Sequence, residues 1–240
     1  MTNYKQIAGE KAAEFCRDGM VLGLGSGSTA AYAVIRIGQL LREGKLKDIV
    51  GIPTSSQTAK LAREWNIPLT NLQDRPCIDL TIDGADEVDP QRNLIKGGGG
   101  CLLREKIVAR ASRREIIVVD PAKLVGYLGH HFLLPVEVIP FGWNLCQSDL
   151  IALGLEPQLR LAAGQPYVTD EGNYILDCRM PPADDLAGLE KAINNIPGVV
   201  ENGLFLGYAD LVIVSGPEGI KSIGSLAGPG RCASPARGVS

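Results

Sequence analysis

Short, almost unbroken runs of apolar residues alternate with helical patterns along the first half of this chain, and this alternation limits the folds available to it. Each run has the length of a single strand and is apolar on both faces. Strands of that kind are typical of parallel sheets whose two faces are both covered by helices. The predicted strands lie at residues 20–24, 49–52, 67–72, 77–82 and 115–119, and the predicted helices at 4–18, 29–42, 55–65 and 102–112.

The pattern changes near residue 130. The predicted strands there are 135–139, 156–161, 167–169, 174–178 and 198–205, with helices at 143–153 and 184–195 and a hairpin turn at 170–173. Helices on one side of an antiparallel sheet make an α+β unit. The apolar strand at 209–215 is expected to rejoin the first sheet. We therefore predict an α/β domain of residues 1–130 and 207–224, a smaller α+β domain at 131–206, and a flexible tail at 225–240.

Size and charge exclude several classes of function. A chain of 240 residues that is 45% hydrophobic can bury a substantial core. A net charge of −3, without a block of like charges, argues against a nucleic acid or an anionic membrane as partner. No apolar run approaches the length of a membrane span, and the N-terminus lacks a signal-peptide core. We therefore expect a cytoplasmic protein.

The cysteines are scattered and contain no CxxC pair. They are Cys16, Cys77, Cys101, Cys146, Cys178 and Cys232. This spacing is typical neither of a zinc site nor of a disulfide framework. We expect small buried thiols in a reducing compartment.

A glycine-rich loop at 25–29 (GSGST) lies between a predicted strand and a predicted helix. Glycines let the backbone approach an anion, and the helix N-terminus offers N–H groups, so the loop predicts phosphate binding. The dinucleotide pattern GxGxxG fails because Ser28 stands where a glycine is needed, and no lysine follows the loop as in a P-loop. The alternative is a tight turn with a Ser or Thr helix cap and no ligand.

Four charged residues follow closely after the strand at 77–82. Asp83 and Asp86 mark the strand end, Lys96 precedes four glycines, and Glu105 lies in the helix beyond them. We interpret Glu105 as a general base and Lys96 as a group that stabilises an oxyanion. The alternatives are an Asp-rich turn, a carboxylate-only magnesium site and a solvated helix face.

Other polar residues are weaker candidates. Lys123 follows the strand at 115–119, and because strand ends of a parallel sheet share one edge, it could reach the same ligand. Lys5 on the first helix is expected near an anion. His130 and His131 are interpreted as structural or surface residues, and charges such as Glu137 and Asp177 as ordinary fold chemistry.

Several of these motifs together resemble the type A ribose-5-phosphate isomerases. The motifs are GSGSTA at 25–30, DGADE at 83–87, KGGG at 96–99, LREKI at 103–107, LPVEVIP at 134–140 and NIPGVV at 195–200. They fall in the order and spacing of that family and cover about residues 4–224. Two departures are Ser26, where the family often has threonine, and Cys101, where alanine is common.

The resemblance implies a fold and a reaction. The fold is a Rossmann-like parallel sheet with helices on both faces, plus a smaller ferredoxin-like α+β domain. The reaction interconverts D-ribose 5-phosphate and D-ribulose 5-phosphate through an enediolate in the pentose phosphate route, and in carbon fixation where that occurs. The family works without a metal or cofactor and usually forms dimers or tetramers.

The resemblance also implies roles for single positions. Glu105 matches the proton acceptor, and Asp83, Asp86 and Lys96 match residues at the reacting end of the sugar. The positions that match substrate contacts are Ser26, Gly27, Ser28, Thr29, Gly84, Ala85, Gly97, Gly98, Gly99, Lys123 and Lys5.

Two rival functions are weighed against this one. A non-catalytic sugar-phosphate sensor would need a DNA-binding segment or a partner, and would have no use for Asp83, Lys96 and Glu105 together. A nucleotide-dependent enzyme is disfavoured by the failed phosphate-loop patterns.

Overall fold

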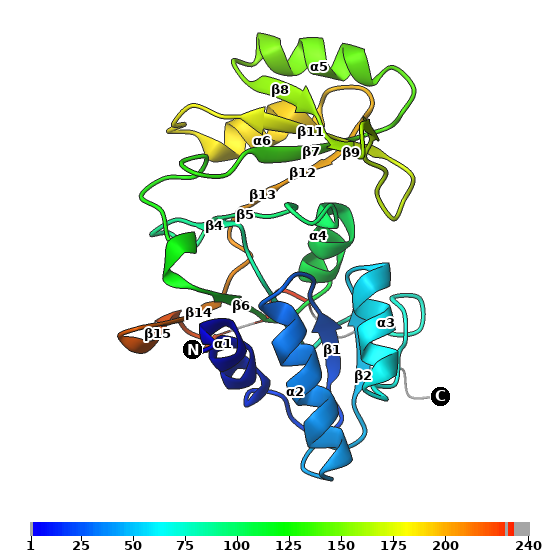
Figure 1. Ribbon diagram of the computed structural model, residues 1–240, viewed down its shortest axis with the longest axis vertical. Helices are drawn as coiled ribbons and strands as arrows, with labels where there is room; N and C mark the ends of the chain where they lie inside the picture. The colour runs from blue at the N-terminus through cyan, green and yellow to red at the C-terminus, as the bar shows by residue number, and fades with distance from the viewer. Residues whose placement is uncertain (1, 229, 233–240) are drawn as a thin grey trace. The chain divides into compact units, whose positions relative to one another are not determined.

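The computed structural model describes residues 2–228 and 230–232. Within them the chain forms two compact units (Figure 1). Unit 1 contains residues up to Gly84, then Arg104–Pro121 and the chain from Tyr208 onward; unit 2 contains Ala85–Leu103 and Ala122–Gly207. The chain therefore passes between the units after residues 84, 103, 121 and 207. The domain boundaries drawn from the sequence stay a prediction.

Unit 1 contains a six-stranded sheet in the order β15-β14-β6-β3-β1-β2. The strands are β1 (Val21–Leu24), β2 (Val50–Pro53), β3 (Leu80–Asp83), β6 (Glu115–Val119), β14 (Leu211–Gly216) and β15 (Gly219–Gly224). Neighbouring strands are parallel except for β15, which runs antiparallel to β14 at the edge. The predicted parallel sheet is confirmed, including the return of the chain to it through β14.

Helices cover both faces of this sheet. They are α1 (Tyr4–Ala13), α2 (Ala30–Arg42), α3 (Ser56–Glu64) and α4 (Leu102–Arg110), followed by the short 3-10 helix η1 (Pro121–Lys123). Leu22 and Leu24 of β1 pack with α1, α2 and α3 in one core cluster. Val21 packs in another cluster with Val108 of α4. Because successive strand side chains point to opposite faces, this alternation places α4 on the face opposite the other three helices.

Two features of unit 1 differ from the sequence predictions. The predicted strand at 67–72 forms only one bridge, between Leu69 and Gly51. Strand β15 was not predicted, because its residues are mostly exposed and contain two glycines, so they lack the apolar pattern of the inner strands.

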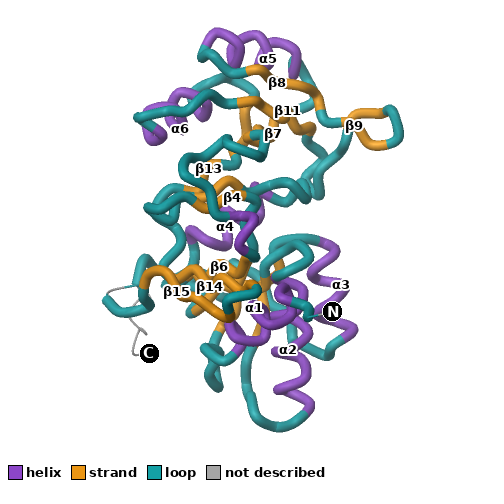
Figure 2. Tube along the Cα trace, turned by 60° about the vertical axis from the view of Figure 1, so that its left-hand side comes forward, coloured by secondary structure: helices purple, strands orange, loops and turns teal. Residues whose placement is uncertain are grey.

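Unit 2 is built around a four-stranded antiparallel sheet in the order β12-β7-β11-β8. Its strands are β7 (Leu134–Val138), β8 (Glu156–Leu159), β11 (Tyr174–Arg179) and β12 (Val199–Asn202). Its helices are α5 (Trp143–Ala152) and α6 (Leu186–Asn194), drawn in purple in Figure 2. Both helices pack in one core with strand residues such as Val136 and Leu176. The chain order βαββαβ with this strand order confirms the ferredoxin-like unit.

Smaller strands complete unit 2. A three-stranded sheet joins β4 (Glu87–Val88), β5 (Leu94–Ile95) and β13 (Leu204–Phe205), and a hairpin joins β9 (Leu161–Ala162) to β10 (Gln165–Pro166). The predicted strand at 167–169 is wrong, because the paired strands end before it and turn around Ala163 and Gly164. Both of these residues have a positive φ, as a tight hairpin turn requires. The predicted turn at 170–173 is present, with the Thr169 N–H donating to the Asn173 carbonyl at 2.9 Å.

The segment from Ser225 to Cys232 has contacts that its composition did not predict. The Ser225 N–H donates to the Asp210 carbonyl, and Arg231 forms an ion pair with Asp210 at 2.9 Å. Cys232 forms a disulfide with Cys77, with the Cα atoms 6.0 Å apart. Residues 229 and 233–240 of the predicted tail lie outside the described residues.

The disulfide corrects the expectation that all cysteines are free thiols. Cysteines are paired by their position in space, and a separation of 155 residues leaves no local sequence signal. The expectation of buried thiols is confirmed for Cys16, Cys146 and Cys178. Burial raises the pKa of the Cys16 thiol to about 12.

None of the helices within the described part of the chain has the length and apolar character that a membrane crossing requires.

Candidate active site

The glycine loop at 25–29 follows β1 at the carboxyl edge of the unit 1 sheet, and Asp83 holds it there. Oδ1 of Asp83 accepts hydrogen bonds from the Ser26 N–H at 3.0 Å and the Gly84 N–H at 2.7 Å. A Cβ at Gly25 would lie 2.4 Å from the same oxygen, so only glycine fits. The fully buried Asp83 therefore ties the ends of β1 and β3 together.

The Ser26 hydroxyl belongs to a cluster of hydroxyl groups. Its Oγ lies 2.7 Å from Thr54 Oγ1, 2.8 Å from Ser55 Oγ and 3.1 Å from Thr58 Oγ1. These three partners follow β2 and begin α3, so they share the carboxyl edge with the loop. The sequence analysis missed them as site residues, although the run of hydroxyl residues at 54–56 after an apolar strand was a usable signal.

The start of α2 has no side-chain cap at its N-cap position. Thr29 precedes the helix, and its side chain makes no capping hydrogen bond. This argues against the alternative that the loop is only a capped turn. Lys5 Nζ donates to Ser28 Oγ at 2.9 Å, so Lys5 lies beside the loop, and its contact with an anion stays a prediction. A lysine charge and a helix N-terminus together suit an anion.

Glu105 lies in the first turn of α4. The packing of α4 on the sheet determines how far along the strands Glu105 lies. A Cβ on Gly23 of β1 would lie 2.9 Å from Val108 Cγ1, so Val108 packs directly on this strand. Glu105 is three residues earlier and shares that helix face. Ala111, just after the C-terminal end of α4, accepts a hydrogen bond from the Ile78 N–H, and Ile78 lies just before the start of β3. The C-terminal end of α4 is therefore at the amino edge of the sheet, and its first turn lies toward the carboxyl edge.

Glu105 is therefore placed toward the edge that carries Asp83 and the 25–29 loop. Its side chain is buried, with 6% exposure. Lys106, next to Glu105 in sequence, is also buried. This argues against the alternative that Glu105 belongs to a solvent-exposed charged face of α4.

In unit 2 the loop at 96–100 depends on glycine at three of its four glycine positions. Gly97 and Gly100 have φ values of +105° and +78°, which favour glycine. A Cβ on Gly98 would lie 2.7 Å from Phe132 Cζ and 2.9 Å from the Asp86 carboxylate. The Gly98 N–H donates to Asp86 Oδ2 at 2.8 Å, so Asp86 and this loop are held together.

Two lysines of unit 2 lie against aromatic rings. Lys96 is buried, and its Nζ lies 5.5 Å from the centre of the Phe205 ring. Lys123 Nζ lies 5.7 Å from the centre of the Phe132 ring, the ring that also borders Gly98. Lys123 and the glycine loop therefore share Phe132 as a neighbour.

Two side chains remote in sequence also hold this loop. Arg160 Nη1 donates to the carbonyls of Gly97 and Gly98, and the Tyr167 hydroxyl donates to the Gly99 carbonyl. The sequence analysis missed both, since neither stands in a recognisable motif.

Other candidates do not join these groups. His130 and His131 are exposed, as a surface role predicts, and the His130 ring contacts the rings of His131 and Tyr127. Among residues 2–228 and 230–232, no group of three or more His, Cys, Asp or Glu side chains is arranged to hold a metal ion.

Comparison with known proteins identifies the family. Residues 50–219 match the family model described as ribose 5-phosphate isomerase A (phosphoriboisomerase A). The ribose-5-phosphate isomerase A of Chloroflexus aurantiacus is 53% identical over 220 residues, covering 91% of this chain and 92% of the relative. The probable ribose-5-phosphate isomerase 2 of Arabidopsis thaliana is 51% identical, covering 90% and 84%.

Solved structures agree in fold. A D-ribose-5-phosphate isomerase in complex with phospho-erythronic acid has 44% identity and a TM-score of 0.90, covering 92% of this chain and 98% of the relative. The ribose 5-phosphate isomerase of Plasmodium falciparum has 39% identity, a TM-score of 0.90 and the same coverage. The chain belongs to the ribose 5-phosphate isomerase A family.

Proposed function

We propose that this protein is an aldose–ketose isomerase that interconverts D-ribose 5-phosphate and D-ribulose 5-phosphate in the pentose phosphate pathway. The family membership supports the reaction, and the two groups of site residues supply the chemistry that it needs. A relative of known structure binds phospho-erythronic acid, a phosphorylated sugar acid, which is consistent with a sugar phosphate as ligand. Participation in carbon fixation, where an organism carries it out, belongs to the same proposal.

Glu105 is the proposed general base. Its carboxylate takes the proton from C2 of the open-chain aldose, and the electron pair forms an enediolate with the negative charge on O1. O1 takes up a proton as the O2 hydroxyl gives up its own, and the carboxylic acid returns its proton to C1, which leaves the carbonyl at C2. Asp83 assists proton transfer as the furanose ring opens. A carboxylate with little access to water is suited to accept a carbon-bound proton, because its charge is poorly solvated.

Lys96 and the glycine loop that follows it are the proposed oxyanion stabilisers. The ammonium group and backbone N–H groups offset negative charge as it forms on the sugar oxygens. Asp86 orients the hydroxyl groups of the same substrate, and Lys123 contacts it. Gly84 and Ala85 join the two aspartates and complete the substrate-contacting segment.

The phosphate is proposed to bind at residues 26–29, with Lys5 beside it. The 2.9 Å contact of Lys5 with Ser28 supports this placement. Binding energy at this remote end holds the sugar in position for proton transfer.

The burial of Glu105 at the carboxyl edge is the observation that carries the mechanism, and Glu105→Gln tests it. The variant keeps the shape of the side chain and removes its basicity, so kcat should fall by at least about 10²–10⁴-fold. Ribulose 5-phosphate formation in a coupled assay gives the rate, and thermal unfolding shows whether the fold is retained. Glu14→Gln is the matched control, because Glu14 is exposed and pairs with Lys11. Near-normal turnover by Glu105→Gln would reject the assignment.

Catalysis is proposed to need no metal ion. The same assay with and without a chelator tests this, and the rates should agree. A rate that is lost with chelator and restored by a divalent cation would instead favour the carboxylate metal site.

Self-association with a second copy is part of the proposal. Large apolar side chains are exposed at the start of α5 and along it, with Phe141 90%, Leu145 66% and Ile151 57% exposed. Exposed apolar groups of this size are typical of interaction surfaces. Light scattering should give two or four times the mass of one chain, and Phe141→Asp should shift the protein toward monomer.

A cytoplasmic location is also proposed, because a charged sugar phosphate does not cross a bilayer unaided. A reducing cytoplasm keeps cysteines as thiols, so the Cys77–Cys232 pair reports the compartment. Protein trapped in cells with an alkylating reagent should show both as thiols, and air-oxidised protein should show the disulfide. A disulfide in the freshly trapped protein would contradict this location.

A further inference from the structure

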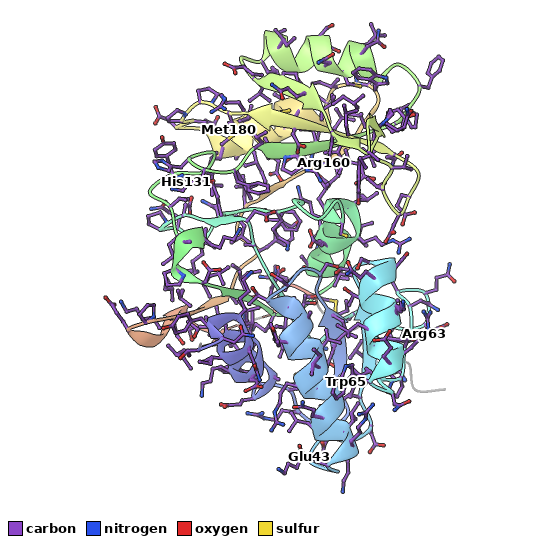
Figure 3. All side chains as sticks on the ribbon, viewed as in Figure 1. Glu43, Arg63, Trp65, His131, Arg160 and Met180 are labelled. Atoms are coloured by element: carbon purple, nitrogen blue, oxygen red, sulfur yellow. A yellow bond between two sulfur atoms is a disulfide. The ribbon has the colours of Figure 1, made fainter. Side chains whose placement is uncertain are left out.

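Arg160 stands between β8 and β9 of unit 2, and its guanidinium group is nearly enclosed. Figure 3 labels it beside the four-stranded sheet. Its side chain is 15% exposed, and Asp177 on the neighbouring strand β11 is 20% exposed. Arg160 Nε donates to Asp177 Oδ2 at 2.8 Å, and Nη2 donates to Asp177 Oδ1. This two-point contact fixes the plane of the guanidinium group.

The remaining edge of that group holds the glycine loop. Nη1 donates to the carbonyl oxygens of both Gly97 and Gly98, each at 3.1 Å. Backbone bonds secure the arginine itself, since the Arg160 N–H donates to the Ile175 carbonyl and the Tyr167 N–H donates to the Arg160 carbonyl. Asp177, Arg160 and the loop therefore form one connected support.

This arrangement decides which way the loop's amide groups point. In a trans peptide the N–H group points opposite to the C=O group of the same unit. The Gly97 carbonyl shares its unit with the Gly98 N–H, and the Gly98 carbonyl shares its unit with the Gly99 N–H. Both N–H groups are consequently directed away from Arg160, and the first of them donates to Asp86.

Tyr167 adds a third contact on the same side of the loop. Its hydroxyl donates to the Gly99 carbonyl at 3.2 Å, and its ring centre lies 5.7 Å from the Arg160 guanidinium carbon. Burial raises the pKa of Tyr167, so the hydroxyl stays a donor in neutral and mildly alkaline solution. The carbonyls of three consecutive residues are thus held by two side chains.

We propose that Arg160, fixed by Asp177, is a positioning residue for the isomerase reaction. It holds the 97–99 loop so that the Gly99 N–H, Asp86 (which accepts from the Gly98 N–H) and the adjacent Lys96 meet the sugar oxygens. This inference rests on the proposed function, because it acts through the oxyanion role given there to Lys96 and the loop. A lysine cannot replace Arg160, because one ammonium group cannot bind a carboxylate at two points and two carbonyls at once.

Arg160→Ala and Arg160→Lys test the proposal. Misplaced catalytic groups cost about 10²-fold in rate, so kcat should fall by roughly 10–100-fold in both variants. KM should change less than about threefold, because the phosphate site at 26–29 is untouched. Guanidinium ion at millimolar concentration should restore part of kcat to Arg160→Ala in a saturable manner. A general loss of folding would produce neither the split between kcat and KM nor the rescue.

Arg179→Ala is the matched control. Arg179 and Glu156 join the same two strands, β11 and β8, with a 3.6 Å ion pair, but their side chains are 71% and 75% exposed. Kinetics and thermal unfolding of this variant should match the parent protein. If Arg160→Ala does not fold, Arg160→Lys carries the test, since it retains the positive charge and the aliphatic stem.

The outcomes separate this inference from the proposed function. Wild-type kcat in folded Arg160→Lys, together with an inactive Glu105→Gln, would overturn the positioning role alone. An active Glu105→Gln would overturn the proposed mechanism whatever Arg160 does. If kcat of Arg160→Ala falls tenfold or more and guanidinium ion restores part of it, while Glu105→Gln is inactive, both the positioning role and the proposed mechanism are supported.

Discussion

The two glycine loops of this protein are held through different backbone groups, one through N–H groups and the other through carbonyls. In unit 1 the loop at 25–29 is held by a carboxylate, since Asp83 accepts from the N–H groups of Ser26 and Gly84. In unit 2 the loop at 97–99 is held mainly through its carbonyls, by Arg160 and Tyr167.

The difference follows from what each loop is proposed to bind. The first loop ends at a helix N-terminus and has Lys5 beside it, so it keeps donors for a phosphate even though Asp83 occupies the Ser26 N–H group. The second loop follows only the two-residue strand β5. The Arg160 guanidinium group and the Tyr167 hydroxyl on its carbonyls orient the N–H groups away from the protein support. The direction of the backbone N–H groups in a glycine loop can therefore be assigned only when the side chains that bind the loop are known.

The largest expected effect comes from Gly25→Ala, which breaks the carboxylate-held loop. The new Cβ would lie 2.4 Å from Asp83 Oδ1 and 2.5 Å from Asp83 Cα, and backbone cannot move aside cheaply. Overpacking should cost about 1–3 kcal/mol of unfolding free energy, and displacement of Asp83 should lower kcat/KM by at least about 10²-fold. Urea unfolding and the coupled assay measure the two effects.

Gly27→Ala is the control for that experiment. Gly27 also lies in the loop, with φ of +93°, but a Cβ there meets nothing within 4 Å. The cost should be limited to the strained backbone, about 1–2 kcal/mol. Equal losses of kcat/KM in the two variants would show that the collision with Asp83 is not decisive.

Gly98→Ala tests the carbonyl-held loop in the same way. Its Cβ would collide with Phe132 and the Asp86 carboxylate, so the loop must shift, and we expect kcat to fall by about 10²-fold. Gly99→Ala has open space around the new methyl group and no positive φ, so its unfolding free energy should change by less than about 0.5 kcal/mol. Equal kcat values for the two variants would indicate that loop position does not limit the reaction.

Lys5→Ala sharpens the phosphate assignment of the first loop. Loss of a charged hydrogen-bond donor should remove about 1.5–3 kcal/mol of binding, which raises KM by roughly 10–100-fold with little change in kcat. Inorganic phosphate should inhibit the variant more weakly than the parent protein. Lys11→Ala on the same helix is the control, because Lys11 pairs with the exposed Glu14. A fall in kcat at constant KM would place Lys5 elsewhere in the mechanism.

The loops themselves could be predicted from the sequence, but their holders could not. The many glycines and charged residues at 83–105 indicated the site, because the packing of a hydrophobic core does not require such a segment. Asp177 was interpreted as ordinary fold chemistry, and Arg160 was not noticed, since their meeting depends on the register of β8 against β11. Thr54 and Ser55 stand in a hydroxyl run that was a usable signal, but their contact with Ser26, like that of Thr58, also requires the pairing of β1 with β2.

The fold was predicted where burial is uniform and missed where it is not. Strands such as β6 are buried along their whole length and nearly all apolar, and were located correctly, whereas the exposed edge strand β15 carries no such pattern. The Cys77–Cys232 disulfide joins segments 155 residues apart and depends on the path of the chain after β15. Tertiary contacts of this kind are set by the whole sheet rather than by any local pattern.

The smallest expected effect tests the support behind Tyr167 in unit 2. Glu137 Oε1 accepts from Thr169 Oγ1 and Asn173 Nδ2, each at 2.9 Å, and so anchors the turn that follows Tyr167. Burial raises the pKa of Glu137 above its ordinary value. The folded state therefore binds this proton more tightly than the unfolded state does, and the resulting stabilisation is lost as pH rises through the raised pKa.

Glu137→Gln removes that titration while its amide oxygen still accepts both hydrogen bonds. The variant should gain unfolding free energy relative to the parent protein as pH rises from about 4 to about 7, because the parent must hold a buried charge at the higher pH. Urea unfolding at several pH values measures this difference, in which the other titrating groups cancel. If the difference in unfolding free energy stays constant across this pH range, neighbouring groups compensate the charge on Glu137. The contacts that support the second loop would then be as insensitive to pH as a hydrogen bond between neutral groups.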